Sequence, residues 1–514
     1  MNGPEVLTIQ HALFSLSDRT GAEGLAAALI ERGATVWATE GTATALAAHG
    51  IEARAVGDLV GQGAWLGGRV KTLHPGLLGG VLARRAVEQD MLDLAERGIP
   101  AFDLVVCTLY PFESLPADAP WDKAIETIDV GGVTMLRAAA KNVRDVAVLS
   151  SSAQYGDALA ALSEHGGVPR TLRLAWARAA FERTALYDAA IAERFAREAS
   201  GEAGPPATWV RGFRRARTLR YGENPHQEAA LYTGAGAALV DAVLEGKELS
   251  YNNLVDLEAA TALVHEFAGP ACVVVKHNEP AGVGKGARAF EAFERAFEAD
   301  ALSAFGGVVA FNVEVDAETG AALAKPFLEC VAAPSFAPAA LDTLRAKKNL
   351  RLVRAHAPAP ARWEARALGD GVLVQGVRAD APGLKLEVAT QRAPTPEEME
   401  ALLFAWTVVG RARSNAIVIA RVDRTLGVGS GQTSRIDAVE LALLKARRSG
   451  HDTHGAVLAS DGFFPFGDWV EPARAAGITA AIQPGGSMRD AESVAACDQA
   501  GIALVLTGRR LFRH

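Results

Sequence analysis

Short apolar runs alternate with polar turns along this chain, and the pattern predicts strands and helices in turn. His11–Leu16 and Thr35–Ala38 are typical of buried strands, and residues 23–32 between them form an Ala- and Leu-rich helix that Gly33 ends. A strand, a helix and a second strand in this order predict a βαβ unit. The first part of the chain therefore has the pattern of an α/β fold.

Another clear buried strand is the run of small and β-branched residues at 271–275, which stops at Lys276 and His277. Open α/β sheets place their chemistry at strand ends. On an extended chain the two side chains point in different directions, so His277 could accept a proton while Lys276 stabilises a nearby negative charge. A polar strand cap and a solvated lysine are the alternative on these residues alone.

Small polar residues follow each of the first two strands. Hydroxyls, backbone N–H groups and a helix N-terminus together favour a bound phosphate, although Ser, Thr and Asp also cap helices routinely. Two such turns in tandem favour the phosphate. The candidate residues are Ser17, Asp18, Arg19, Thr39, Gly41 and Thr42.

Three further segments carry side chains suited to an anionic substrate. The first is a glycine-flanked loop with two cations, where the backbone can approach a ligand closely. The second is the end of an apolar strand at 102–109, and the third is a helix at 134–141 with the turn before it. A lysine in the last helical turn also favours the helix dipole, so Lys141 has a structural alternative. The candidates are Arg69, Lys71, Thr72, Thr108, Tyr110, Asp129 and Lys141.

Length and composition narrow the class of protein. A chain of 514 residues exceeds what one core usually fills, so two or more domains are expected. The net charge of −8 argues against a general nucleic-acid coat. The four cysteines have no CxxC spacing, and HDTH at 451–454 has no third ligand nearby in the sequence, so no metal site is expected. No signal peptide, membrane span or internal repeat is evident, which favours a cytoplasmic enzyme.

Four strings in the first part of the chain resemble one family. SLSDRTG, GGRVKTLHPG, LYPF and IDVGGVTMLRAAAKN are similar to the inosine monophosphate (IMP) cyclohydrolase domain of the bifunctional purine biosynthesis proteins. These proteins also carry aminoimidazole carboxamide ribonucleotide (AICAR) transformylase. The resemblance implies a methylglyoxal synthase-like fold for residues 1–200.

By this resemblance the first domain closes a ring in formylated AICAR (FAICAR), and no metal is needed. Lys141 is then the proton donor and acceptor. Residues Lys71, Thr72, Tyr110 and Asp129 surround the reacting groups, and Ser17, Asp18, Arg19, Thr39, Gly41, Thr42 and Arg69 hold the ribose phosphate. Thr108 stands where the family often has Asn.

An Ala-, Gly- and Pro-rich stretch at 198–209 predicts the domain boundary. After it, VVVKHNEPAGVG, LSAFGGVVAFN, RSNAIVIA, GVGSGQTSRID, SDGFFPFGDWV, PGGSMRD and GRRLFRH resemble the transformylase half in the family's order. For residues 201–514 the resemblance implies two related α/β subdomains of cytidine deaminase-like fold. The H-x-E and P-C-x-x-C ligands of zinc deaminases do not occur here, so zinc is not implied.

The transformylase moves a formyl group from 10-formyltetrahydrofolate to the AICAR amine. By similarity His277 is the proton acceptor and Lys276 the stabiliser. The nucleotide ligands would be Arg220, Tyr221, Gly306, Glu329, Asn415, Arg435, Phe463 and Arg510, and the folate side would be Ile436, Asp468 and Met488. The family forms homodimers whose transformylase sites use both subunits, and a monovalent cation is an open possibility.

The resulting hypothesis is a bifunctional enzyme that makes FAICAR and then IMP. Two rival hypotheses follow from the same residues. The first is a monofunctional transformylase whose first domain only binds a nucleotide, and the second is a nucleotide sensor without catalysis. Fold analogy alone excludes neither.

Overall fold

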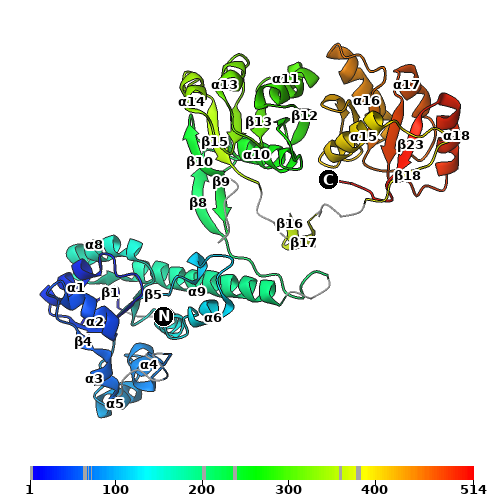
Figure 1. Ribbon diagram of the computed structural model, residues 1–514. Helices are drawn as coiled ribbons and strands as arrows, with labels where there is room; N and C mark the ends of the chain where they lie inside the picture. Colours follow the sequence, from blue (N-terminus) through cyan, green and yellow to red (C-terminus); the bar gives the residue numbers. More distant parts are fainter. Residues whose placement is uncertain are drawn as a thin grey trace. The chain divides into compact units, whose positions relative to one another are not determined.

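A computed structural model describes residues 4–61, 66, 69–70, 72–199, 204–234, 240–357, 362–377 and 384–514. The chain forms two compact units, Met1–Arg214 and Arg215–His514. The α/β character expected from the sequence is confirmed in both units (Figure 1). Within the described residues, no helix combines the length and the apolar character needed to cross a membrane.

Unit 1 is built on a parallel sheet in the order β4-β3-β2-β5-β6. Its strands are β2 (His11–Leu16), β3 (Thr35–Ala38), β4 (Arg54–Ala55), β5 (Leu104–Thr108) and β6 (Ala147–Leu149). A two-stranded sheet pairs β1 (Val6–Leu7) with β7 (Val168–Pro169). The predicted strands His11–Leu16 and Thr35–Ala38 are confirmed to the residue.

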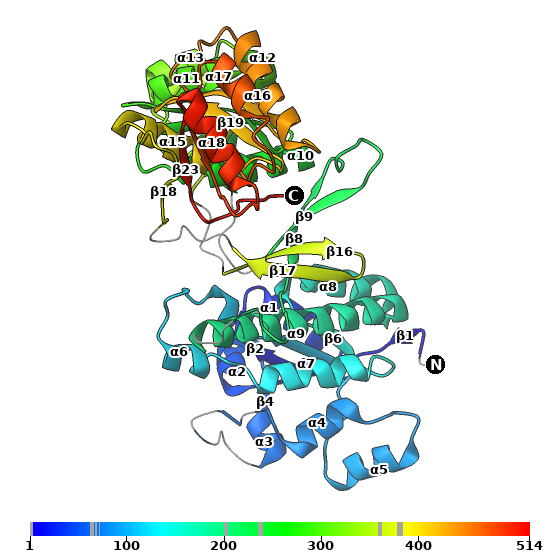
Figure 2. The same cartoon turned by 90° about the vertical axis from the view of Figure 1, so that its right-hand side faces the viewer.

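Helices cover both faces of this sheet, because its strands are apolar on both sides. Phe14 of β2 packs into one core with α1 and α8, whereas Leu13 packs into the other with α4, α7 and α9. Figure 2 shows α7 and α9 running side by side across one face. The helices are α1 (Ala22–Glu31), α2 (Glu40–Ala47), α3 (Val56–Val60), α4 (Pro75–Leu82), α5 (Glu88–Glu96), α6 (Trp121–Glu126), α7 (Gly131–Lys141), α8 (Tyr155–His165) and α9 (Arg170–Glu198).

Unit 2 contains two six-stranded sheets with the same strand order. The first, β10-β15-β14-β13-β11-β12, comprises β10 (Val240–Glu245), β11 (Ala271–Lys276), β12 (Glu279–Lys285), β13 (Val308–Phe311), β14 (Cys330–Ala333) and β15 (Arg351–Ala355). The second, β18-β23-β22-β21-β19-β20, comprises β18 (Glu387–Val388), β19 (Ile417–Ala420), β20 (Thr425–Gly429), β21 (Val457–Ser460), β22 (Ala480–Gln483) and β23 (Ala503–Leu506).

The helices of the two sheets also correspond. The first sheet carries α10 (Tyr251–Val264), α11 (Ala289–Ala299), α12 (Ala301–Ala304), α13 (Ala317–Leu323) and α14 (Pro338–Arg345). The second carries α15 (Pro396–Val409), α16 (Arg435–Arg448), α17 (Val470–Ala475) and α18 (Asp490–Ala500). Two hairpins complete the unit, β8 (Arg214–Leu219) with β9 (Ala229–Thr233) and β16 (Trp363–Leu368) with β17 (Gly371–Gly376).

The two sheets are a structural repeat, with parallel and antiparallel pairs in the same places. The expectation that the chain has no internal repeat is therefore wrong for unit 2. One apolar core contains residues of both sheets and of α10 and α15, so the two repeats share their buried interior.

Candidate active sites

The turn after β2 is organised by Thr108, the last residue of β5. Its Oγ1 accepts the backbone N–H groups of Ser17 at 2.9 Å and Asp18 at 3.0 Å, and its hydroxyl faces the Asp18 carbonyl at 3.1 Å. The Asp18 carboxylate accepts the backbone N–H of Thr20 at 3.0 Å. This hydrogen bond is the main reason why the pKa of Asp18 is lowered. The predicted turn is thus a tight, hydrogen-bonded loop at the carboxyl edge of the sheet.

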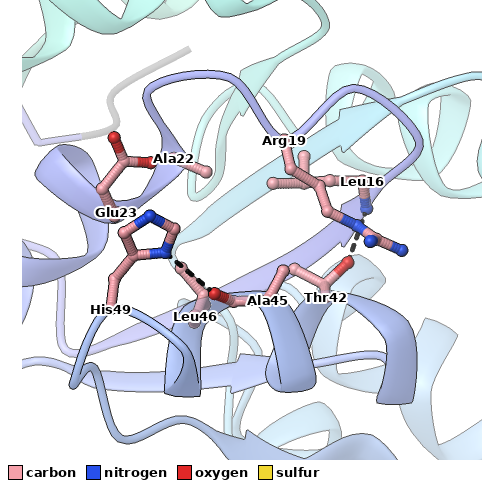
Figure 3. Close-up of a pocket in the computed structure, with 8 residues that line it drawn as sticks. All are labelled: Leu16, Arg19, Ala22, Glu23, Thr42, Ala45, Leu46 and His49. Atoms are coloured by element: carbon pink, nitrogen blue, oxygen red, sulfur yellow. Dashed lines mark hydrogen bonds between the residues drawn. The ribbon is translucent and has the colours of Figure 1, made fainter.

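The turn after β3 lies beside it. Thr42 Oγ1 accepts the backbone N–H of Leu16 at 3.0 Å and the Thr39 hydroxyl at 3.2 Å. Arg19 extends across the first turn of α2, where a Cβ on Gly41 would lie 2.9 Å from Arg19 Nη2. Arg19 and Thr42 help line the small pocket in Figure 3. A cation, two hydroxyls and a helix N-terminus therefore meet here, as a phosphate requires.

A second cluster surrounds Asp129 at the N-terminus of α7. Asp129 Oδ1 accepts the Gly132 N–H at 2.7 Å, and Oδ2 accepts the Tyr110 N–H at 3.4 Å. Burial raises the pKa of the Asp129 carboxyl. Thr72 faces the same turn, because a Cβ on Gly131 would lie 2.3 Å from Thr72 Oγ1. Three predicted residues, Thr72, Tyr110 and Asp129, are therefore brought together.

Sequence reasoning missed Tyr187, which supports this cluster from α9. Its hydroxyl oxygen accepts the Asp129 N–H at 2.8 Å and donates to the Thr127 carbonyl at 3.2 Å. Burial raises the pKa of Tyr187 to about 12, so it stays protonated. A tyrosine in the middle of a long helix gives no sequence signal for this role.

Two predicted residues of unit 1 do not join these clusters, and a third, Lys71, cannot be placed. Lys141 is exposed at the other end of the 11-residue helix α7, about 15 Å along the axis from the turn that holds Asp129. Arg69 is exposed and pairs with Glu126. Lys71 lies outside the described residues, as do the neighbouring Gly67 and Gly68.

In unit 2, Lys276 ends β11 and pairs with Glu279 of β12, so His277 and Asn278 form a two-residue hairpin loop. Both have positive φ, 56° and 65°, as a type I′ turn requires. The interpretation as an extended strand end is therefore confirmed for Lys276, the last residue of β11, and is wrong for His277, which lies in the turn. Asn and His tolerate this left-handed conformation better than most residues, which is why the turn forms without glycine.

Three contacts fix this turn. The Asn278 N–H donates to Asp256 Oδ1 of α10 at 2.6 Å, and Arg513 Nη2 donates to Asn278 Oδ1 at 3.1 Å. Lys276 Nζ donates to the Phe305 carbonyl at 2.8 Å. Burial raises the pKa of Asp256, while the N–H groups of Asn278 and His277 act in the opposite direction. The His277 ring itself remains exposed to solvent.

Gly306 and Glu329 lie close to this turn. Gly306 follows Phe305, whose carbonyl holds Lys276, and it has a φ of 73°. Glu329 Oε2 accepts Asn253 Nδ2 of α10 at 2.9 Å, and its charge raises the pKa of Asp256.

The second repeat contributes a cationic cluster. Arg435 is buried at the start of α16, where Nη1 donates to Ser460 Oγ at 2.8 Å and Asp461 Oδ1 at 2.5 Å. Its Nη2 donates to Asn415 Oδ1 at 2.7 Å. Phe512 lies between two arginines, with its ring centre 5.9 Å from the Arg435 guanidinium and 4.4 Å from that of Arg510. The predicted residues Asn415, Arg435 and Arg510 therefore gather here.

The segment Leu511–Arg513 connects this cluster to the hairpin turn. The Leu511 N–H donates to the Asp461 carbonyl at 2.8 Å, and the Arg513 carbonyl accepts the Ser414 N–H at 2.9 Å. Because Arg513 also binds Asn278, the two halves of unit 2 form one continuous site. Sequence reasoning missed Arg513 and Asp256, which come from distant parts of the chain.

Most of the other predicted residues of unit 2 lie on loops. Ile436 is the exception, because it follows Arg435 in α16 and is half-buried. Phe463 and Asp468 are exposed after β21, and Met488 is exposed after β22. At the end of β8 the Arg220 guanidinium lies 5.4 Å from the Tyr221 ring centre. Their loop contacts the first turn of α10, where Asn252 Nδ2 donates to the Glu223 carbonyl at 3.3 Å.

The four cysteines are buried and unpaired. Burial raises the pKa of the Cys107 and Cys272 thiols well above the usual range. Among the residues that the structure describes, no three His, Cys, Asp or Glu side chains are grouped so as to hold a metal ion.

The fold is that of an α/β protein in which each of the two units carries clusters of polar and charged side chains. Residues 139–445 match the family described as AICARFT/IMPCHase bienzyme, and residues 21–134 match the MGS-like domain. The chain therefore belongs to the AICARFT/IMPCHase bienzyme family, and its first unit contains the MGS-like domain.

Curated relatives carry the same two-part description. The bifunctional purine biosynthesis protein PurH of Anaeromyxobacter dehalogenans strain 2CP-1 is 47% identical, with 98% of this chain and 100% of that protein covered. PurH of Parasynechococcus marenigrum is 48% identical over 98% of this chain and 99% of the relative. PurH of Xanthomonas campestris strain 8004 is 45% identical over 99% of both. The whole chain is thus similar to bifunctional proteins.

Proposed function

We propose that this protein makes IMP from AICAR in two reactions, formyl transfer in unit 2 and ring closure in unit 1. The observation that carries the proposal is near full-length similarity to bifunctional purine biosynthesis proteins, in a chain with one polar cluster in each unit. This assigns residues 1–200 to the cyclohydrolase and 201–514 to the transformylase, of which the second would comprise two cytidine deaminase-like repeats.

In formyl transfer, the AICAR amine attacks the formyl carbon of 10-formyltetrahydrofolate. A C–N bond forms, the bond to the folate N10 breaks, and the amine proton moves to N10. The amine is conjugated with its ring and is a poor nucleophile, so proton removal during attack lowers the barrier. The exposed His277 ring suits this proton transfer, and Lys276 suits the developing oxyanion.

The type I′ turn supports this division of labour. Asp256 and Arg513 hold Asn278 from two sides, so the backbone that carries His277 is fixed before substrate arrives. The proposed nucleotide ligands are Arg220, Tyr221, Gly306, Glu329, Asn415, Arg435, Phe463 and Arg510, and the proposed folate side is Ile436, Asp468 and Met488.

In ring closure, the FAICAR carboxamide nitrogen attacks its own formyl carbon, and water leaves. Both reacting groups belong to one molecule, so the enzyme needs to fold the substrate and to move protons. Asp129 suits proton transfer, because burial raises its pKa toward the working pH. Ser17, Asp18, Arg19, Thr39, Gly41 and Thr42 would hold the phosphate, and Thr72 and Tyr110 lie beside Asp129. By the family resemblance Lys71 would also take part.

We expect the protein to work as a cytoplasmic homodimer that uses AICAR, FAICAR and 10-formyltetrahydrofolate and needs no catalytic metal. We expect neither nucleic acid nor membrane as a partner.

Two assays on purified protein test the function. AICAR with 10-formyltetrahydrofolate should yield IMP, and FAICAR alone should also yield IMP. The variant His277→Ala should lose the first reaction and keep the second, because the two sites are separate. Absence of both reactions in the folded wild-type protein would contradict the proposal, and formyl transfer without ring closure would support a monofunctional transformylase.

A further inference from the structure

The repeat in unit 2 allows each residue of one sheet to be matched with a residue of the other. The middle strands begin their antiparallel pairing at equivalent places, Cys272 with Phe311 in the first repeat and Ile417 with Ser460 in the second. Asn312 directly follows Phe311 at the end of β13, and Asp461 directly follows Ser460 at the end of β21. These two residues therefore hold the same position in the two repeats.

Asn312 and Asp461 also make the same backbone contact. Asn312 Oδ1 accepts the Ala271 N–H at 2.9 Å, and Asp461 Oδ1 accepts the Ala416 N–H at 3.2 Å. In both repeats this bond fixes the start of the middle strand, because Ala271 is the first residue of β11 and Ala416 comes directly before β19. The other polar atom of each side chain also bonds to an equivalent residue. Asn312 Nδ2 donates to the Gly269 carbonyl, and Asp461 Oδ2 accepts the Ser414 hydroxyl.

The repeats differ in the helix that follows the hairpin. The first residue of α11 is Ala289, and the first residue of α16 is Arg435. The glycines of the preceding strands show that these positions correspond, because Gly284 lies against Ala292 and Gly429 lies against Ala438. The carboxylate therefore occurs in the repeat that has the arginine, and the neutral amide occurs in the repeat that lacks it.

We propose that Asp461 is a positioning residue for formyl transfer, holding Arg435 in the orientation that binds the nucleotide. The inference rests on the proposed function, in which Arg435 is a nucleotide ligand. Asp461 is fully buried and cannot touch substrate, so it acts through the guanidinium. A buried ion pair adds little net stability, so its value here lies in orientation. An arginine ordered in advance avoids the entropy cost of ordering on binding.

The test is steady-state formyl transfer by the full-length protein with three variants. Asp461→Asn gives the second repeat the side chain of the first and keeps an acceptor for Ala416. It should raise the KM for AICAR about tenfold or more, because a charged hydrogen bond to Arg435 is lost. The KM for 10-formyltetrahydrofolate and ring closure of FAICAR should not change. The double variant with Arg435→Ala should be no worse than Arg435→Ala alone.

A matched control distinguishes the effect of losing the backbone hydrogen bond from the effect of losing the contact with Arg435. Asn312→Ala removes the equivalent contact in the first repeat, so it should lower the Tm and leave the KM for AICAR unchanged. If Arg435→Ala leaves the KM for AICAR unchanged, Arg435 is not a nucleotide ligand, and the positioning role of Asp461 is wrong as well. If Arg435→Ala raises it and Asp461→Asn does not, the inference alone is overturned. Should Asp461→Asn not fold, Ser414→Ala loosens Asp461 while keeping both charges, and an unchanged KM there overturns the inference.

Discussion

Asp129 is the residue whose surroundings best match a proton-transfer role in unit 1. It is held by two backbone N–H groups and supported by Tyr187, while burial raises the pKa of its carboxyl. The family resemblance gives proton transfer to Lys141, which lies exposed at the far end of α7. A single helix thus separates the two candidates.

Two variants distinguish these candidates. Asp129→Asn keeps an acceptor for Gly132 but removes the base, so ring closure of FAICAR should fall about a hundredfold or more. Lys141→Ala should retain most of this activity, because an exposed side chain about 15 Å away along the helix cannot reach the same substrate atoms. Formyl transfer serves as the internal control for folding. If folded Lys141→Ala protein loses ring closure while Asp129→Asn stays active, Lys141 and not Asp129 transfers the proton.

Arg183 of α9, which pairs with Glu113, allows a test of this site through its pH dependence. Burial raises the pKa of Asp129, while the N–H groups of Gly132 and Tyr110 lower it. The positive charge of Arg183 adds a smaller lowering effect. In Arg183→Gln this charge is gone, so the pKa of Asp129 rises. The carboxylate then forms only at higher pH, and the acid limb of the ring-closure profile should move to higher pH. Rates measured from acidic to neutral pH test this.

Arg178→Gln is the matched control for this shift, because Arg178 lies on the same helix but is exposed and pairs with Glu182. Its pH profile should coincide with that of the wild type. A shift of equal size in both variants would show that the helix surface charge, and not Arg183 itself, sets the profile.

Neighbouring residues could be predicted from the sequence where they lie at the ends of strands. Ser17 follows β2 and Thr108 ends β5, and polar residues at the ends of adjacent parallel strands meet at one edge of a sheet. The contacts of Tyr187 and Arg513 could not be predicted, because each residue comes from an element that is distant in sequence and has no local pattern of its own.

At the scale of elements, close approach between strand and helix defines the repeat in unit 2. A Cβ on Gly282 of β12 would lie 1.9 Å from the Ala296 carbonyl oxygen of α11, and one on Gly427 of β20 would lie 2.1 Å from that of Ala442 in α16. Helix and strand can pack at this distance only with glycine. The string GVG followed by one residue and Gly occurs at both places, 282–286 and 427–431. This short match was the sequence signal for the repeat.

The close packing predicts a strong effect of one methyl group. Gly282→Ala should lower the free energy of unfolding by about 3 kcal/mol, because α11 must move away from β12. Gly269→Ala in the same unit meets no atom within 4 Å and should have little effect. Chemical denaturation of the full-length variants measures both. Equal stability of the two variants would mean that α11 can shift without cost.

Element type was predictable where one apolar run made one strand, as for β2, β3 and β11. The turn at Lys276 was not, because a buried run looks the same whether its neighbour is parallel or antiparallel. The hairpin depends on pairing with Glu279, and a tight turn without glycine carries little signal.

At the scale of the whole molecule, the two compact units meet between Arg214 and Arg215, a few residues after the Pro-rich stretch at 198–209 that separates the two sets of motifs. The shared interior of unit 2 has no comparable signal in the sequence. Its core draws on α10 and α15 and on both sheets, so the residues that pack together are spread over most of the unit.

That shared core has a consequence for the history of the chain. A protein with only one of the two sheets would expose the apolar face that the other now covers, and self-association would be the simplest way to bury it. The repeat therefore points to an ancestor of half the size that paired with its own copy. Fusion of two such genes would leave the halves free to diverge, and they now differ at this place, with the neutral Asn312 in one and the charged pair of Asp461 and Arg435 in the other.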